Sequence, residues 1–83
     1  SYIPGDHTEW TAEINCVKVL NKDTDKMITI PYPGAALWDL LQQKYPIDRI
    51  ISIMSAVTGK NRTYVKNLVE NNIHKWLEDG LIQ

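Results

Sequence analysis

Length, composition and charge place this chain among small, ordinarily folded domains. With 83 residues, 43% of them hydrophobic and 23% charged, it is too short for two domains and too apolar for a disordered chain. We therefore expect one domain over residues 1–83 with a single modest core. The formal net charge of −1 excludes a general electrostatic attraction to nucleic acid or to an anionic membrane.

The N-terminal part predicts an arm followed by strand structure. Residues 1–9 are expected to form a loose arm. From Trp10 to Cys16 apolar and polar residues alternate with the period of a strand. After Cys16 the alternation shifts by one residue, which indicates either a bulge or a break between two short strands.

A hairpin is predicted next. Residues 21–26 are polar and read as a turn, and residues 27–30 form a short apolar strand that is ended by Pro31 and Pro33. The economical arrangement pairs residues 17–20 with residues 27–30.

Helical spacing of apolar residues begins after Pro33-Gly34 and predicts two helices before residue 60. The first closes at Tyr45-Pro46, because the residue before a proline is pushed out of the helical region. The second starts near Pro46 and turns at Gly59. Their expected apolar stripes are Ala36, Leu37, Leu40 and Leu41, with Trp38 at the margin, and then Ile47, Ile50, Ile51, Met54 and Val57.

The stretch from Asn61 to Asp79 predicts the longest helix. Asn61 is a suitable N-cap, and Gly80 stands where a left-handed C-cap residue is wanted. Its apolar positions recur at helical spacing, so we expect Val69 and Ile73 to be buried. The full apolar stripe is Val65, Leu68, Val69, Ile73, Trp76 and Leu77. Strands followed by three helices predict an α+β, winged-helix-like fold: a small N-terminal antiparallel sheet, then three helices with a helix-turn-helix pair.

Two segments resemble the PqqD family, the peptide-recognition domains of pathways that modify ribosomally made peptides. They are Gly34-Ala35-Ala36-Leu37-Trp38-Asp39-Leu40-Leu41 and Trp76-Leu77-Glu78-Asp79-Gly80-Leu81-Ile82, and the likeness extends over residues 17–82. The resemblance implies a non-catalytic cytoplasmic domain, a peptide chaperone without cofactor. It would capture the leader segment of a precursor peptide and present it to a modifying enzyme of the radical SAM or peptidase/ligase type.

The resemblance also implies where the leader binds, namely between the sheet edge and the third helix. If residues 27–30 are that edge, their backbone can accept an added strand. The candidate peptide-binding residues are Met27, Ile28, Thr29, Ile30, Tyr64, Lys66, Asn67, Glu70 and Asn71. Lys66 is expected to pair with an acidic leader residue.

The sequence shows no catalytic motif and no metal-binding spacing. The lone Cys16 excludes an internal disulfide, suits a reducing compartment and reads as a small hydrophobe. Trp38 and Trp76 are expected in the core, and His74 is expected to be a solvated partner of a glutamate one helical turn away. No apolar run approaches the roughly 18 residues of a membrane span.

DNA binding is the alternative function. Lys60, Arg62 and Lys66 lie at the start of the third helix with no acidic residue among them, where a helix-turn-helix protein meets the major groove. The acidic residues later in the helix and the net charge of −1 argue against it, because phosphate contacts supply much of the affinity for DNA. A purely structural domain of a larger enzyme is the third possibility.

Overall fold

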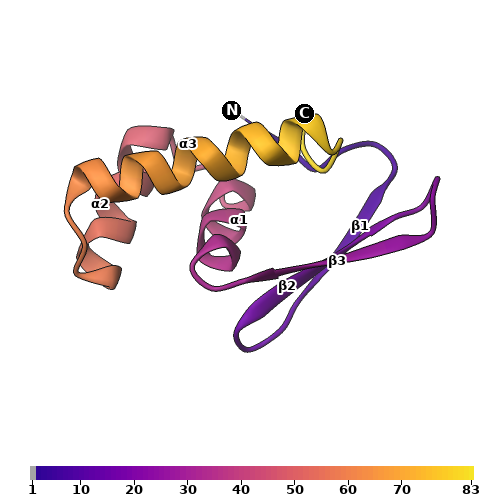
Figure 1. Ribbon diagram of the computed structural model, residues 1–83, viewed down its shortest axis with the longest axis horizontal. Coiled ribbons are helices and arrows are strands. Elements are labelled where there is room, and N and C mark those ends of the chain that lie inside the picture. The colour runs from indigo at the N-terminus through magenta and orange to yellow at the C-terminus, as the bar shows by residue number, and fades with distance from the viewer. Residues whose placement is uncertain (1) are drawn as a thin grey trace.

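The computed structural model describes residues 2–83 and contains a three-stranded sheet followed by three helices (Figure 1). The strands are β1 (Thr8–Ala12), β2 (Cys16–Asn21) and β3 (Lys26–Pro31), and the helices are α1 (Gly34–Gln42), α2 (Ile47–Thr58) and α3 (Arg62–Glu78). The sheet is antiparallel with the order β1-β2-β3. The expected α+β class and the order of elements are confirmed.

The predicted hairpin is present and a third strand precedes it. Val17 lies opposite Ile30 and Leu20 opposite Met27, which is the expected pairing. The shift of alternation near Cys16 comes from a chain reversal over residues 13–15, so the break between two strands is correct and no bulge is needed. Ile14, expected to continue the apolar face of a strand, sits at this reversal and is 97% exposed.

The core lies between the sheet and the helices. Helix α1 packs on β2 and β3 and also on α2 and α3. Trp38, expected at the margin of its stripe, is fully buried and meets Trp10 and Trp76 edge-on, with ring centroids 6.1 and 5.4 Å away. The core positions of Trp38, Trp76, Val69 and Ile73 are confirmed.

Two positions of the predicted stripes stay exposed. Val57 is 69% exposed and Leu77 is 42% exposed, against the expectation that both face the core. Each lies in the last turn of its helix. A helical stripe predicts which face is apolar but not how far along the helix a neighbouring element covers it.

The helix ends follow local rules except at α1. The Asn61 side chain accepts a bond from the Tyr64 N–H at 2.8 Å, and Gly59 and Gly80 both have φ of 72°. Helix α1 ends at Gln42, short of the expected Tyr45-Pro46. The cause is a left-handed residue, Lys44 with φ of 66°, after which the Tyr45 N–H donates back to the Leu40 carbonyl at 3.4 Å.

The expected loose arm is instead tied to the C-terminus. The N–H of Ile3 donates to the Gln83 carbonyl at 3.0 Å, the Gln83 N–H donates back at 2.8 Å, and the Gly5 N–H donates to the Leu81 carbonyl at 2.9 Å. Figure 1 shows the two ends of the chain side by side. The arm expectation is wrong over residues 2–9: residues 3–5 pair with the far end of the sequence, and Thr8 and Glu9 belong to β1. Ser1 lies outside the described residues.

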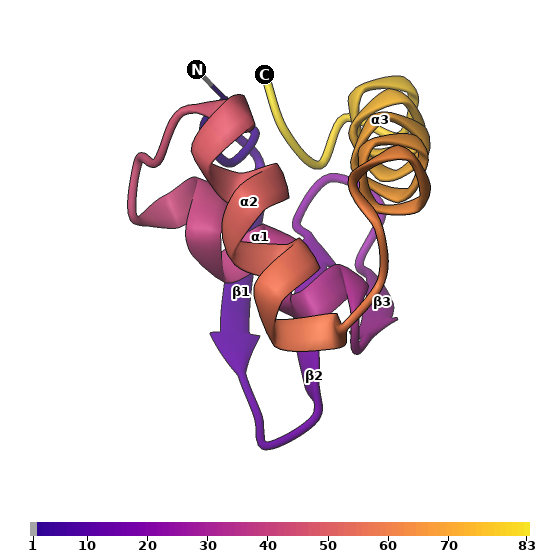
Figure 2. The ribbon, with the colours of Figure 1, turned by 90° about the vertical axis from the view of Figure 1, so that its left-hand side faces the viewer.

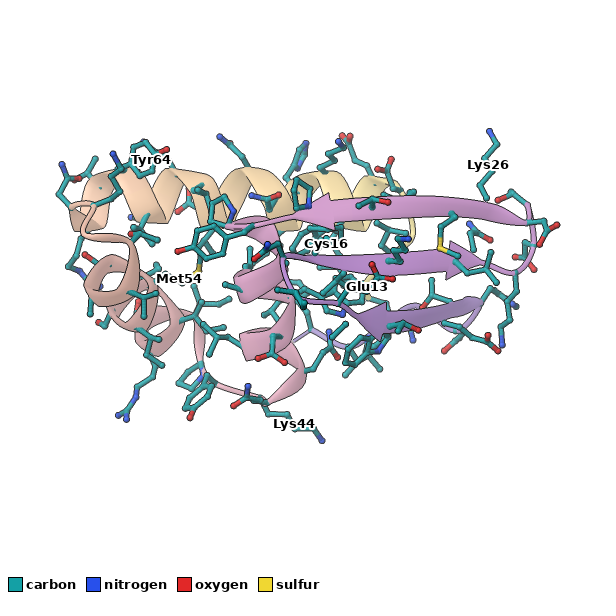
Figure 3. All side chains as sticks on the ribbon, turned by 90° about the horizontal axis from the view of Figure 1, so that it is seen from below. Glu13, Cys16, Lys26, Lys44, Met54 and Tyr64 are labelled. Carbon is teal, nitrogen blue, oxygen red and sulfur yellow. The ribbon has the colours of Figure 1, made fainter. Side chains whose placement is uncertain are left out.

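Helix α3 runs along the long dimension of a molecule measuring 37 × 24 × 19 Å. Among the three strands, β3 is on the side of α3 both in Figure 2 and in Figure 3, and β1 is on the far side. The fold therefore sets one edge of the sheet alongside its longest helix.

Candidate functional site

Within residues 2–83, no strand pairs with the edge of β3 that faces away from β2. The Tyr32 N–H donates to the Asn15 carbonyl at 3.0 Å, which identifies residues 15 and 32 as a hydrogen-bonded pair of the ladder. Bonded and non-bonded pairs alternate along an antiparallel ladder. With the observed register, Ile30 and Ile28 also form bonded pairs with β2.

The remaining residues of β3 direct their backbone outward. The N–H and C=O groups of Met27 and Thr29 point to the open edge, and Pro31 adds a carbonyl but no N–H. Met27 and Thr29, which are two residues apart on β3, therefore present four outward polar groups. This is the pattern that an added strand requires.

The side chains of β3 divide between two faces. Ile30 is 5% exposed and Ile28 is half-buried, and both face the helices. Met27 is 57% exposed and Thr29 is exposed, so both face away from the core. Of the four predicted strand residues, Met27 and Thr29 supply backbone groups to the open edge. Ile28 and Ile30 supply an apolar wall beside it.

One flank of α3 approaches the end of β3. A Cβ placed on Gly34 would lie 3.0 Å from Ile30, 3.5 Å from the Asn72 side-chain oxygen and 3.8 Å from Trp76. Tyr64 and Leu68, two turns and one turn before Asn72, line a cavity of about 310 Å³ together with Tyr32, which follows β3. We call Tyr64, Leu68 and Asn72, spaced four residues apart, the β3 flank of α3.

The cavity has a largely apolar lining. Its further lining residues come from the start of α1, from α2 and its turn, and from α3: Pro33, Met54, Val57, Thr58, Lys60 and Val65. The exposed Val57 is thereby accounted for, since its side chain forms part of this wall. A chain extended along β3 and continuing past Pro31 would reach the cavity next.

The other predicted residues of α3 do not face β3. Lys66 lines a hollow with Asp48 and Ile51, and Glu70 lines another with Ile47, so both face α2 and its start. Asn67 and Asn71 are exposed and line neither hollow nor cavity. Among the five predicted helix residues, Tyr64 alone lines the cavity beside β3.

The sequence pattern did not indicate Leu68, Asn72 and Tyr32 as residues of the candidate site. The four-residue spacing of Tyr64, Leu68 and Asn72 is visible in the sequence, and it leads directly to the buried Trp76. The sequence alone does not give the rotation of the helix about its axis, which is set by how α3 packs on α2 and α1. Asn72 is held by its own amide, which donates to the Leu68 carbonyl at 2.8 Å.

The three basic residues of the DNA alternative each have a partner inside the molecule. The Lys60 ammonium lies 5.6 Å from the centre of the Tyr64 ring, and the Arg62 guanidinium donates to the Ser52 hydroxyl at 2.6 Å. Lys66 lies 4.0 Å from the Glu70 carboxylate. Only the contact with Glu70 offsets a positive charge, and the other two hold the Lys60 and Arg62 side chains against the protein.

Residues 2–83 show few features of a metal site, a membrane span or a nucleophilic catalyst. This range holds no group of three or more His, Cys, Asp or Glu placed to bind a metal, and no helix long and apolar enough to cross a membrane. His74 lies 3.0 Å from Glu78, the predicted pairing one turn apart. Cys16 is half-buried, and burial together with the Glu13 carboxylate raises the pKa of its thiol, the opposite of what an activated nucleophile needs.

Comparison with known proteins gives a fold relationship. The chain is similar to a solved structure described as TbiB1 in complex with the TbiA(beta) leader peptide, with a TM-score of 0.89 and 16% sequence identity. The match covers 96% of this chain and 93% of that chain, so the whole domain shares the fold. No family model and no curated protein matches the sequence, so the resemblance to the PqqD family stays a prediction.

Proposed function

We propose that this domain binds the leader segment of a ribosomally made precursor peptide by adding it as a strand to β3. The observation that carries the proposal is the open edge, where Met27 and Thr29 offer both N–H and C=O groups beside the β3 flank of α3. The structural relative of the same fold is described in complex with a leader peptide, which supports this assignment.

The geometry suggests how recognition divides between backbone and side chains. A leader of about six residues extends over roughly 20 Å, the length of a short strand. Its backbone bonds to Met27 and Thr29, and its alternate side chains enter the space bounded by Ile28, Ile30 and the β3 flank of α3. The backbone supplies affinity for any extended chain, and the apolar cavity selects which leader binds.

The role of the domain is to bind and not to catalyse. It holds the leader while a modifying enzyme of the radical SAM or peptidase/ligase type acts on the rest of the precursor, in the cytoplasm. No cofactor enters this role. DNA binding is the weaker alternative, because Lys60, Arg62 and Lys66 are engaged within the molecule and the net charge is −1.

The decisive experiment replaces one outward donor. Thr29→Pro removes an N–H of the open edge and leaves the β2–β3 ladder bonded, because the N–H of Thr29 does not point to β2. Loss of one backbone bond should weaken leader binding about three- to tenfold. The measurement is NMR titration of the labelled domain with a synthetic candidate leader peptide, where amide shifts should gather in residues 26–32 and 64–76.

A matched control uses the opposite edge of the sheet. The Glu13 N–H donates to the Cys16 carbonyl at 2.8 Å, so the neighbouring Ala12 directs its N–H away from β2. Ala12→Pro is therefore the same chemical change at the β1 edge and should leave leader affinity unchanged. Undiminished affinity in a folded Thr29→Pro variant, or shifts confined to α2, would place the leader elsewhere.

A further inference from the structure

A second hollow lies between the β1–β2 turn and α1. Its volume is about 300 Å³, and we call it the hairpin pocket. It is lined by Ala12, Glu13, Ile14, Asn15, Cys16, Val17, Tyr32, Ala35, Ala36 and Asp39. Tyr32 is the one residue that it shares with the cavity beside α3. In Figure 3 Glu13 and Cys16 mark its position near α1.

The hairpin pocket combines small apolar walls with uncovered bulky side chains. Ile14 is 97% exposed at the tip of the turn, and Tyr32 is 51% exposed. Small residues of α1, Ala35 and Ala36, form the opposite wall and leave room between them and the turn. An exposed isoleucine alone needs no explanation, but one at the rim of an apolar hollow marks a surface that a partner can cover.

The charged residues that line the hairpin pocket are both acidic. Its lining residues include the carboxylates of Glu13 and Asp39 and no basic side chain. Lys18 lies 3.5 Å from Glu13 and offsets that charge. Asp39 accepts a hydrogen bond from the Gln43 amide at 2.8 Å, and no cation pairs with it among residues 2–83. A ligand that brings a positive charge would complete the site.

We propose that the hairpin pocket is the docking site for a second protein, which inserts an apolar side chain flanked by a lysine or arginine. The apolar side chain covers Ile14 and fills the space against Ala35 and Ala36, and the cation pairs with Asp39. Because β3 opens toward α3 and the hairpin pocket opens at the turn between β1 and β2, both sites can be occupied together. The docking site stands independently of which ligand β3 binds.

The test is a selection experiment in which the enriched peptides reveal which side chains the hairpin pocket binds. A random 12-residue peptide library displayed on phage is selected on the wild-type domain and counter-selected on Asp39→Lys. Enriched peptides should carry an apolar residue within two positions of a lysine or arginine. Synthetic copies should lose about tenfold or more in affinity on Ile14→Asp and on Asp39→Lys, since both changes strike the centre of the contact.

Controls separate docking from loss of fold and from the leader site. Glu70→Lys reverses an exposed charge on the far side of α3 and should leave the affinity unchanged. Ile14 and Asp39 are exposed, so their variants should melt as the wild type does. Bound peptide should slow alkylation of Cys16, which lines the hairpin pocket, and should not compete with the leader.

Several results would overturn the proposal. They are enriched peptides without a basic residue, an affinity for either variant equal to that for the wild type, or unchanged alkylation of Cys16. Competition with the leader would assign the hairpin pocket to the leader site. Sedimentation of the wild type as a dimer that Ile14→Asp dissolves would assign the surface to a second copy of this chain.

Discussion

The side chain of Trp38 packs between the sheet and the longest helix. Its ring is fully buried and contacts Trp10 of β1 and Trp76 of α3 edge-on. Such aromatic pairs contribute about 0.5–1.5 kcal/mol each beyond their buried area. One side chain of α1 therefore links β1 of the sheet to the longest helix.

Val69 provides the residue-scale test of the core. Its side chain has no exposed surface, so Val69→Asp places a carboxylate where no partner exists. The cost is several kcal/mol, against a total stability of about 5–15 kcal/mol for a domain. We expect the variant to be unfolded by circular dichroism at 25 °C. Asn67→Asp, exposed on the same helix, should change stability by no more than about 0.5 kcal/mol.

The thiol of Cys16 gives a pH-dependent prediction. Partial burial raises its pKa, and so do the charge of the Glu13 carboxylate and its hydrogen bond with the thiol, at a separation of 3.6 Å. Glu13→Gln removes the charge, so the pKa falls and the thiolate fraction at any pH below it grows. Alkylation by iodoacetamide should become faster in the variant near neutral pH, and the two rates should converge well above pH 9. Equal rates near neutral pH would show that Glu13 does not act on the thiol.

At the scale of elements, β3 and α3 make different contributions to the candidate site, since β3 offers backbone groups and α3 offers side chains. β3 is a six-residue strand whose outward N–H and C=O groups come from alternate positions. α3 is a 17-residue helix capped by Asn61 at one end and followed by Gly80 at the other. The strand is short and ends in a proline, which limits pairing between copies of the domain while leaving Met27 and Thr29 available.

The flank of α3 can be tested with two exposed side chains two residues apart. Tyr64 lines the cavity beside β3, whereas Lys66 faces α2. Tyr64→Ala should weaken leader binding about tenfold, because an aromatic side chain at the centre of a contact commonly contributes more than 1 kcal/mol. Lys66→Ala should change it less than about twofold. Fluorescence anisotropy with a labelled leader measures both, and the reverse ranking would return the site to the flank that faces α2.

At the scale of the whole molecule, the two ends of the chain close the fold. Pro4 forms a bridge with Ile82, and Leu81 and Ile82 are buried in the core. The backbone approach is close at Gly5, where an added Cβ would collide with the Gly80 carbonyl oxygen. Since the colliding atom belongs to the backbone, it cannot rotate away as a side chain does.

Gly5→Ala should therefore open the contact between the termini. We expect a loss of about 1–3 kcal/mol in the free energy of unfolding, measured by urea denaturation. The amides of Ile3, Gly5 and Gln83, which donate across this contact, should exchange faster with deuterium. Asp6→Ala removes one exposed side-chain bond to Gln83 and should cost much less. Unchanged exchange in Gly5→Ala would show that the backbone adjusts without opening.

Much of the fold was predictable because the signals are local. The apolar spacing of α3, its Asn61 cap and its following Gly80 depend on residues close together in the chain. The hairpin of β2 and β3 depends on two alternating segments joined by a polar turn. Local propensity and periodicity act within a few residues, so the sequence by itself determined the elements, their order and the α+β class.

The site required the tertiary structure, because it depends on how distant elements meet. The sequence indicates that residues 27–30 can be an edge, but the ladder register decides that Met27 and Thr29 carry the outward groups. It indicates that Tyr64 and Lys66 are on one helix, but the packing of α3 on α2 and α1 decides which of them lies beside β3. The pairing of Ile3 with Gln83 joins opposite ends of the chain. Such contacts are set by burial of the whole core, and no short window of sequence contains both partners.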